Sequence, residues 1–99
     1  MIAKHAGSEP GVVLVTFRLP DSLQADSVHL VGDFNDWDKH SLPLRRTHPG
    51  GPWEVTIEVE RGRTYHFRYL VDGAVWQNDW DADGYAISPF GGNNSVLRT

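Results

Sequence analysis

Acidic residues stand at alternate positions in the stretch DWDADG at residues 79–84, and a glycine follows them in the sixth place. An EF-hand calcium loop begins in this way, because alternate side-chain oxygens surround the ion and the glycine permits a sharp turn. Such a loop also needs a bidentate glutamate in the twelfth place, where this sequence has Phe90. The sequence therefore predicts no calcium site, and we expect these aspartates to shape local turns.

Groups that could perform nucleophilic or acid–base catalysis are present, but no local motif links them. The sequence contains no Gly-x-Ser-x-Gly elbow, no His-x-His or His-x3-His metal spacing and no cysteine. A chain with 13 acidic residues can supply a carboxylate pair by chance, so such a pair alone indicates nothing. We therefore expect that the protein is not an enzyme, with no catalytic residues, no metal and no cofactors.

The four tryptophans are the remaining candidates for a functional role. Trp53 alternates in phase with apolar residues and is predicted to lie in the core. Trp37 ends a polar turn and Trp76 follows an Asp-Gly hairpin signal, so we expect both to be exposed. Trp80 stands among aspartates, and the sequence assigns it neither to the core nor to a surface site.

Exposed tryptophans beside polar side chains are typical of sugar-binding sites. The apolar face of a pyranose ring stacks on a flat aromatic ring, while its hydroxyl groups need hydrogen-bond donors and acceptors. Arg68 offers a rigid fork of donors and Asn94 offers both a donor and an acceptor. The residues alone leave two other interpretations open, a solvated strand face for Arg68 and a turn cap for Asn94.

The elements that would position these residues are short strands. Period-2 alternation of apolar residues predicts strands over residues 13–19, 28–33, 53–60 and 65–71, a short strand through Trp76 and a last strand over 95–98. No segment shows a helical period. The sequence therefore predicts the all-β class, as an immunoglobulin-like antiparallel β-sandwich of about seven strands.

Length and charge limit the domain organisation and the partners. The 99 residues predict a frayed lead-in at 1–10 and a single β-sandwich domain at 11–99. The net charge of −4, without a basic face, argues against a nucleic-acid partner. No stretch resembles a signal peptide or reaches a membrane-spanning length, so we expect a cytoplasmic protein with no membrane partner.

Three motifs in order resemble carbohydrate-binding module family 48. They are VHLVGDFNDWDKHSLPLRR at residues 28–46, YHFRYLVDGAVWQND at 65–79 and FGGNNSVL at 90–97. Members of this family are the early-set glycogen-binding domains of the AMP-activated kinase beta subunit and the N-terminal domains of isoamylases and glycogen branching enzymes. The resemblance covers residues 12–98.

The resemblance implies a non-catalytic module that binds α-1,4-linked glucan such as glycogen or maltooligosaccharide. The two platform tryptophans of the family match Trp37 and Trp76, and a basic strand residue matches Arg68. The apolar residue that wedges into the curved glucan matches Phe90, and an asparagine of the last loop matches Asn94. The alternative is an early-set interaction domain that packs on or regulates a glycogen-metabolising enzyme without binding sugar itself.

Overall fold

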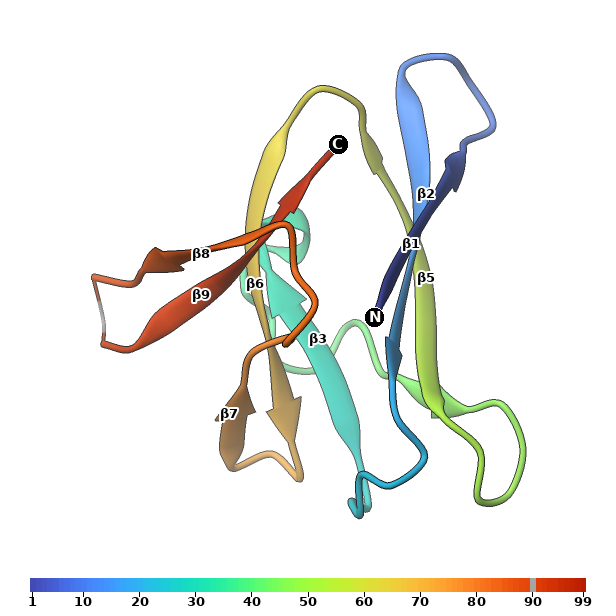
Figure 1. Ribbon diagram of the computed structural model, residues 1–99, viewed down its shortest axis with the longest axis vertical. Helices are drawn as coiled ribbons and strands as arrows, with labels where there is room; N and C mark the ends of the chain where they lie inside the picture. The colour runs from blue at the N-terminus through green and yellow to red at the C-terminus, as the bar shows by residue number, and fades with distance from the viewer. Residues whose placement is uncertain (90) are drawn as a thin grey trace.

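The alternation of apolar and polar residues places the chain in two antiparallel sheets. The computed structural model describes residues 1–89 and 91–99. These residues form β1 (Ile2–Ala6), β2 (Val12–Leu19), β3 (Val28–Gly32), the 3-10 helix η1 (Asp33–Asn35), β4 (Arg45–Arg46), β5 (Trp53–Glu60), β6 (Thr64–Val71), β7 (Val75–Gln77), β8 (Gly84–Ile87) and β9 (Asn93–Arg98). One sheet has the order β1-β2-β5-β4 and the other β3-β6-β9-β8, with β7 paired to β6 (Figure 1).

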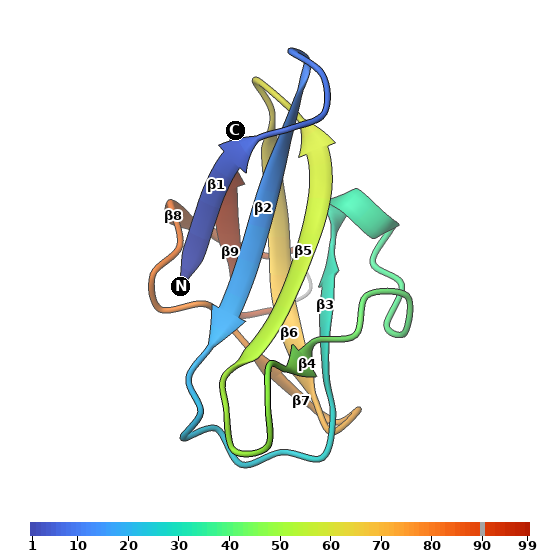
Figure 2. The same ribbon diagram turned by 90° about the vertical axis from the view of Figure 1, so that its right-hand side faces the viewer.

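The two sheets pack face to face, and Figure 2 shows the first sheet in front of the second, with η1 at the end of β3. Phe67 and Tyr69 of β6 are fully buried between the sheets. The ring of Phe67 lies edge-on to Phe17 of β2, with 5.1 Å between the ring centroids. Trp53 is also buried, as its alternation predicted. The predicted all-β, immunoglobulin-like sandwich is confirmed.

Strand β6 carries core residues on one face and site residues on the other. Its inward positions include Phe67 and Tyr69, so the intervening His66 and Arg68 face outward. Along one edge, β6 pairs with β3, and along the other it pairs first with β9 over residues 64–67 and then with β7 over 69–71. Arg68 therefore lies at the junction where β6 changes partner, beside the ends of two other strands.

The structure differs from the predicted strands at both ends of the chain. The frayed lead-in expected for residues 1–10 is wrong over Ile2–Ala6, which form β1 and pair with β2. Only Ile2 and Ala3 of this edge strand are partly buried and its other residues are exposed, so its sequence shows no apolar alternation. The last strand begins at Asn93, two residues before the predicted start at Ser95.

Asp79, the first aspartate of the 79–84 stretch, is buried, and both of its carboxylate oxygens accept hydrogen bonds. Asp79 is 1% exposed, and its Oδ2 accepts a hydrogen bond of 2.6 Å from the Tyr69 hydroxyl. Its Oδ1 accepts a bond of 2.7 Å from the Asp81 backbone N–H, which closes a local turn. The prediction that these aspartates shape turns is confirmed for Asp79.

Asp83 connects the same stretch to β1 and β9 by hydrogen bonds. Its Oδ2 accepts bonds of 2.7 Å from Lys4 Nζ and from the Arg98 backbone N–H. Partial burial opposes ionisation of Asp83, but the bond from Arg98 and the contact with Lys4 outweigh it and lower the pKa of the carboxyl. Over residues 1–89 and 91–99, no group of three or more histidine, cysteine or acidic side chains is placed to hold a metal ion. The same residues include no helix long and apolar enough to cross a membrane.

The Tyr69–Asp79 pair predicts how stability depends on alkaline pH. Burial, and after it the neighbouring Asp79, raises the pKa of Tyr69 well above its usual value. Above about pH 10 the unfolded state therefore binds fewer protons than the native state. The stabilisation is complete below that pH and is lost as the pH rises through the folded-state pKa.

We expect the urea midpoint to fall more steeply above pH 10 in the wild type than in Tyr69→Phe. Because the lysines titrate in both proteins, the difference between the two slopes isolates Tyr69. Unfolding followed by tryptophan fluorescence at several pH values between about 8 and 11 measures it. Equal slopes in the two proteins would contradict the prediction.

Candidate functional site

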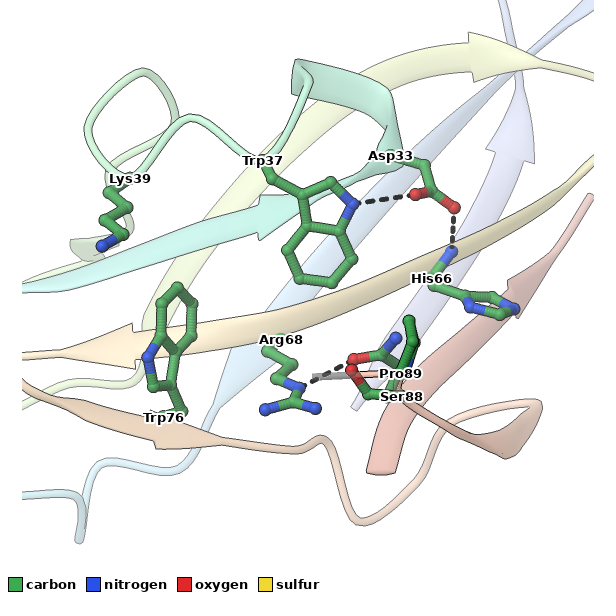
Figure 3. A pocket seen from close by; sticks show the side chains of 9 residues that line it. Asp33, Trp37, Lys39, His66, Arg68, Trp76, Ser88 and Pro89 are labelled. Atoms are coloured by element: carbon green, nitrogen blue, oxygen red, sulfur yellow. Dashed lines mark hydrogen bonds between the residues drawn. The ribbon is translucent and has the colours of Figure 1, made fainter. Parts of the chain in front are cut away.

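A groove of about 550 Å³ lies on the outer face of the second sheet. Its floor comes from β6 and β9, and its walls come from the loop after η1, from β7 and from the segment after β8 (Figure 3). The described residues that line it are Asp33, Trp37, Lys39, His66, Arg68, Trp76, Ser88, Pro89 and Asn94. We call this set the groove.

The loop that carries Trp37 is held by the side chain of Asn35. Its Oδ1 accepts a bond of 3.0 Å from the Gly32 backbone N–H, and its Nδ2 donates to Leu30 O, Asp38 O and Ser41 Oγ at 3.3, 3.1 and 2.9 Å. The chain then turns through two residues in the left-handed region, Asp36 at φ 54° and Trp37 at φ 58°. This conformation is unusual for a bulky side chain, and so the surrounding contacts must impose it.

The edge of the Trp37 ring is tied to the sheet through one carboxylate. Trp37 Nε1 donates a bond of 2.9 Å to Asp33 Oδ1, and Asp33 Oδ2 accepts a bond of 2.7 Å from the His66 backbone N–H (Figure 3). The indole N–H is thus occupied within the protein. Trp37 can offer a ligand the faces of its ring but not this hydrogen-bond donor.

Trp76 forms another part of the wall. The hairpin between β6 and β7 turns through Asp72 and Gly73, both at positive φ (54° and 68°), and pairs Leu70 with Trp76. This register places Trp76 on the same outward face as Arg68. Trp76 is 40% exposed, which confirms the predicted exposure, and Lys39 Nζ lies 5.8 Å from the centroid of its ring.

Arg68 and Asn94 meet on the floor of the groove. Arg68 Nε donates a bond of 2.7 Å to Asn94 Oδ1, and Arg68 Nη2 donates another of 2.7 Å to Gly91 O. Asn94 is only 6% exposed and belongs to β9, not to the last loop where the resemblance placed it. Within the described part of the chain, the Nη1 donors of Arg68 and the Nδ2 group of Asn94 have no hydrogen-bond partner.

The structure thus brings four of the five predicted site residues around one groove: Trp37, Arg68, Trp76 and Asn94. Trp37 is half-buried where the sequence predicted exposure, and its ring edge bonds to Asp33. The fifth residue, Phe90, lies outside the described residues, and its role stays a prediction.

Trp80, which the sequence left unassigned, is 77% exposed and does not line the groove. It borders a separate hollow of about 240 Å³, together with Leu19, Pro20, Ser22, Leu23, Gln77 and Asn78.

The sequence did not single out Asp33, Lys39 or His66 as site residues. Asp33 stands four positions before Trp37, and His66 precedes Arg68 by two positions on the same strand face. These two spacings are the features of the sequence that could have indicated Asp33 and His66 as site residues. The spacing along β6 follows directly from strand alternation, whereas the contact of Asp33 with Trp37 depends on the left-handed turn between them.

The arrangement suits the binding of a ligand with one flat apolar face and a polar rim. Two indole rings supply the apolar contact, while guanidinium and amide groups supply directed hydrogen bonds. Asp33 is the single carboxylate among the described lining residues, and both of its oxygens already accept bonds. A β-sandwich with such an aromatic groove has the features of a carbohydrate-binding module.

Comparison with known proteins identifies the family. The chain belongs to carbohydrate-binding module family 48 (isoamylase N-terminal domain), whose model matches residues 10–90. It is 34% identical over 74 residues, 74% of this chain, to a 1,4-alpha-glucan branching enzyme of Aquifex aeolicus, and 41% identical over 63 residues, 62% of this chain, to one of Novosphingobium aromaticivorans. A third, from Pseudomonas fluorescens, is 43% identical over 47 residues, 46% of this chain. The matched regions make up 12%, 8% and 6% of these three enzymes.

Proposed function

We propose that the protein is a non-catalytic module that binds α-1,4-linked glucan such as glycogen or maltooligosaccharide. The observation that carries the proposal is the position of Trp37 and Trp76 around one groove, with Arg68 and Asn94 on its floor. Family membership and the names of the relatives, which are 1,4-alpha-glucan branching enzymes, support the glucan as ligand.

In this proposal the apolar faces of successive glucose units stack on Trp37 and Trp76. The Nη1 donors of Arg68 and the Nδ2 group of Asn94, which have no partner among the described residues, bond to the sugar hydroxyls, and the bond between the two side chains keeps these donors in a constant orientation. Phe90 would fill the concave side of the glucan, as the resemblance implies. An open groove of this kind gives weak affinity, with a Kd on the order of 10–100 μM, or about −5.5 to −7 kcal/mol.

A second function is favoured by apolar side chains outside the groove. Trp80 and Ile87 are 77% and 87% exposed. Large exposed apolar residues are common at protein–protein contacts. In this second function the module packs on or regulates a glycogen-metabolising enzyme through such exposed side chains, without binding sugar itself.

Tryptophan fluorescence titrated with maltoheptaose tests the glucan proposal. Because the sugar would cover two indole rings, we expect the emission to change and saturate with the weak Kd given above. Cellopentaose, whose β-1,4 linkages make a straight chain, serves as the control and should give no saturable change. A flat signal up to millimolar maltoheptaose would reject the proposal, and a stable complex with a branching enzyme in the absence of sugar would then favour the interaction function.

A further inference from the structure

Asp33 occupies a special position among the residues of the groove. Of the described lining residues it is the single acidic one, and the two oxygens of its carboxylate bond to one wall and to the floor of the site. One oxygen accepts from the ring of Trp37, and the other accepts from the backbone of β6. The carboxylate therefore joins the loop that carries Trp37 to the strand that carries Arg68.

The bond to β6 is possible because β3 ends one residue before Asp33. The β3–β6 register runs from Val28 opposite Val71 to Gly32 opposite Phe67. The next N–H along β6, that of His66, has no further β3 residue to bond, and Asp33 Oδ2 accepts from it at 2.7 Å. The carboxylate thus takes the place of a ladder hydrogen bond and is itself held by the sheet.

The bond between Asp33 and the Trp37 ring restrains the side chain of Trp37, which its backbone hydrogen bond does not. Trp37 sits in the left-handed region, and its backbone N–H bonds to Gly32 O at 2.9 Å. That bond fixes the main chain, but it leaves the side-chain torsions to be set by other contacts. The bond from Nε1 to Asp33 anchors the far edge of the ring, and bonds to an ionised acceptor are stronger than neutral ones.

We propose that Asp33 is a positioning residue for glucan recognition, which holds the Trp37 ring in its stacking orientation before the sugar arrives. This inference rests on the proposed function of the groove. A ring that is already oriented loses little conformational freedom on binding, whereas a ring released from Asp33 must be ordered by the ligand itself. In this role Asp33 acts through the Trp37 ring, since each of its two oxygens already accepts a hydrogen bond from the protein.

The test compares Asp33→Asn with Asp36→Asn. Both variants remove one negative charge from the same loop, but the side chain of Asp36 makes no hydrogen bond with any described residue and does not line the groove. Isothermal titration with maltoheptaose should show affinity reduced about three- to tenfold in Asp33→Asn and unchanged in Asp36→Asn. In a 1H–15N spectrum, the indole resonance of Trp37, assigned by its loss in Trp37→Phe, should move or broaden only in Asp33→Asn.

Exchange of the indole protons in the unmodified protein gives a second measurement, which does not depend on the behaviour of Asp33→Asn. The bonded Nε1–H of Trp37 should exchange with solvent at least about tenfold more slowly than that of the exposed Trp80, because a hydrogen-bonded proton is protected. Equal exchange rates for the two indoles would overturn the inference, whether or not Asp33→Asn folds.

The outcomes separate this inference from the proposal on which it rests. If the wild type binds maltoheptaose and Asp33→Asn binds it equally well, the positioning role is wrong and the glucan function stands. If the wild type itself does not bind maltoheptaose, the proposed function fails, and a role for Asp33 in glucan recognition fails with it.

Discussion

Trp37→Ala is expected to abolish detectable binding of maltoheptaose while the sandwich stays folded. The substitution removes one of the two indole rings among the described lining residues, and loss of an anchoring aromatic at a binding site costs about 2 kcal/mol or more, a factor of about 30 in Kd. An affinity already in the micromolar range would then leave the measurable window. Trp37 lies outside the buried core, so we expect the free energy of unfolding to change by less than about 1 kcal/mol.

Trp80→Ala is the matched control, because it deletes a ring of the same kind that lies on the surface but outside the groove. Isothermal titration should give the wild-type Kd for this variant, and urea unfolding should show both variants folded. Two results would count against the groove as the glucan site. One is a loss of affinity in Trp80→Ala that equals the loss in Trp37→Ala, and the other is unchanged binding in Trp37→Ala.

Gly32→Ala is expected to have the largest effect on stability, about 2–4 kcal/mol of the free energy of unfolding. A Cβ at this position would lie 2.6 Å from the carbonyl oxygen of His66 and 2.7 Å from Cβ of Phe67, and both distances are far below van der Waals contact. The backbone of Gly32 is extended, so the cost is one of space and not of torsion. The methyl group can be accommodated only if β3 and β6 separate.

Gly11→Ala is the control for this prediction. Nothing lies within 4 Å of a Cβ built at Gly11, so we expect its free energy of unfolding to stay within about 0.5 kcal/mol of the wild-type value. Urea denaturation of both variants measures the difference. Similar stabilities for Gly32→Ala and Gly11→Ala would show that β3 and β6 are not as closely packed as the structure has them.

The Gly32→Ala variant should also bind glucan less well, since the Trp37 backbone N–H bonds to Gly32 O and Asp33 follows directly. The loss of stability and the loss of binding are linked, because the close approach of β3 to β6 also brings Asp33 to His66.

The strands that could be predicted from the sequence are those with one buried face. In β5 and β6, apolar side chains such as Val59, Phe67 and Tyr69 must reach the core at every second position, and the sequence records this period directly. Edge strands have no such requirement. In β8, Tyr85 and Ile87 are exposed, so the apolar residues of this strand do not report burial, and no strand was predicted there.

The candidate site could be predicted in its residues but not in its hydrogen bonds. Trp76 and Arg68 were selected from a hairpin signal and a strand face, and both follow from local periodicity. The bond between Arg68 and Asn94 joins residues 26 positions apart, and it exists because β9 pairs with β6. The role of Asp33 depends on two successive left-handed residues, Asp36 and Trp37, which ordinary backbone preferences disfavour for a tryptophan.

The division of β6 into an inner and an outer face has a consequence for how such a module can change over time. Core and groove alternate along one strand, so substitutions at His66 or Arg68 can change the lining of the groove without altering the buried Phe67 or Tyr69. A deletion of one residue within β6 would instead exchange the two sets, sending a guanidinium into the core and an aromatic ring into the solvent. We therefore expect the groove to tolerate wide randomisation by substitution and almost none by insertion or deletion, which makes the outer face of this sheet a usable scaffold for selecting new binding specificities.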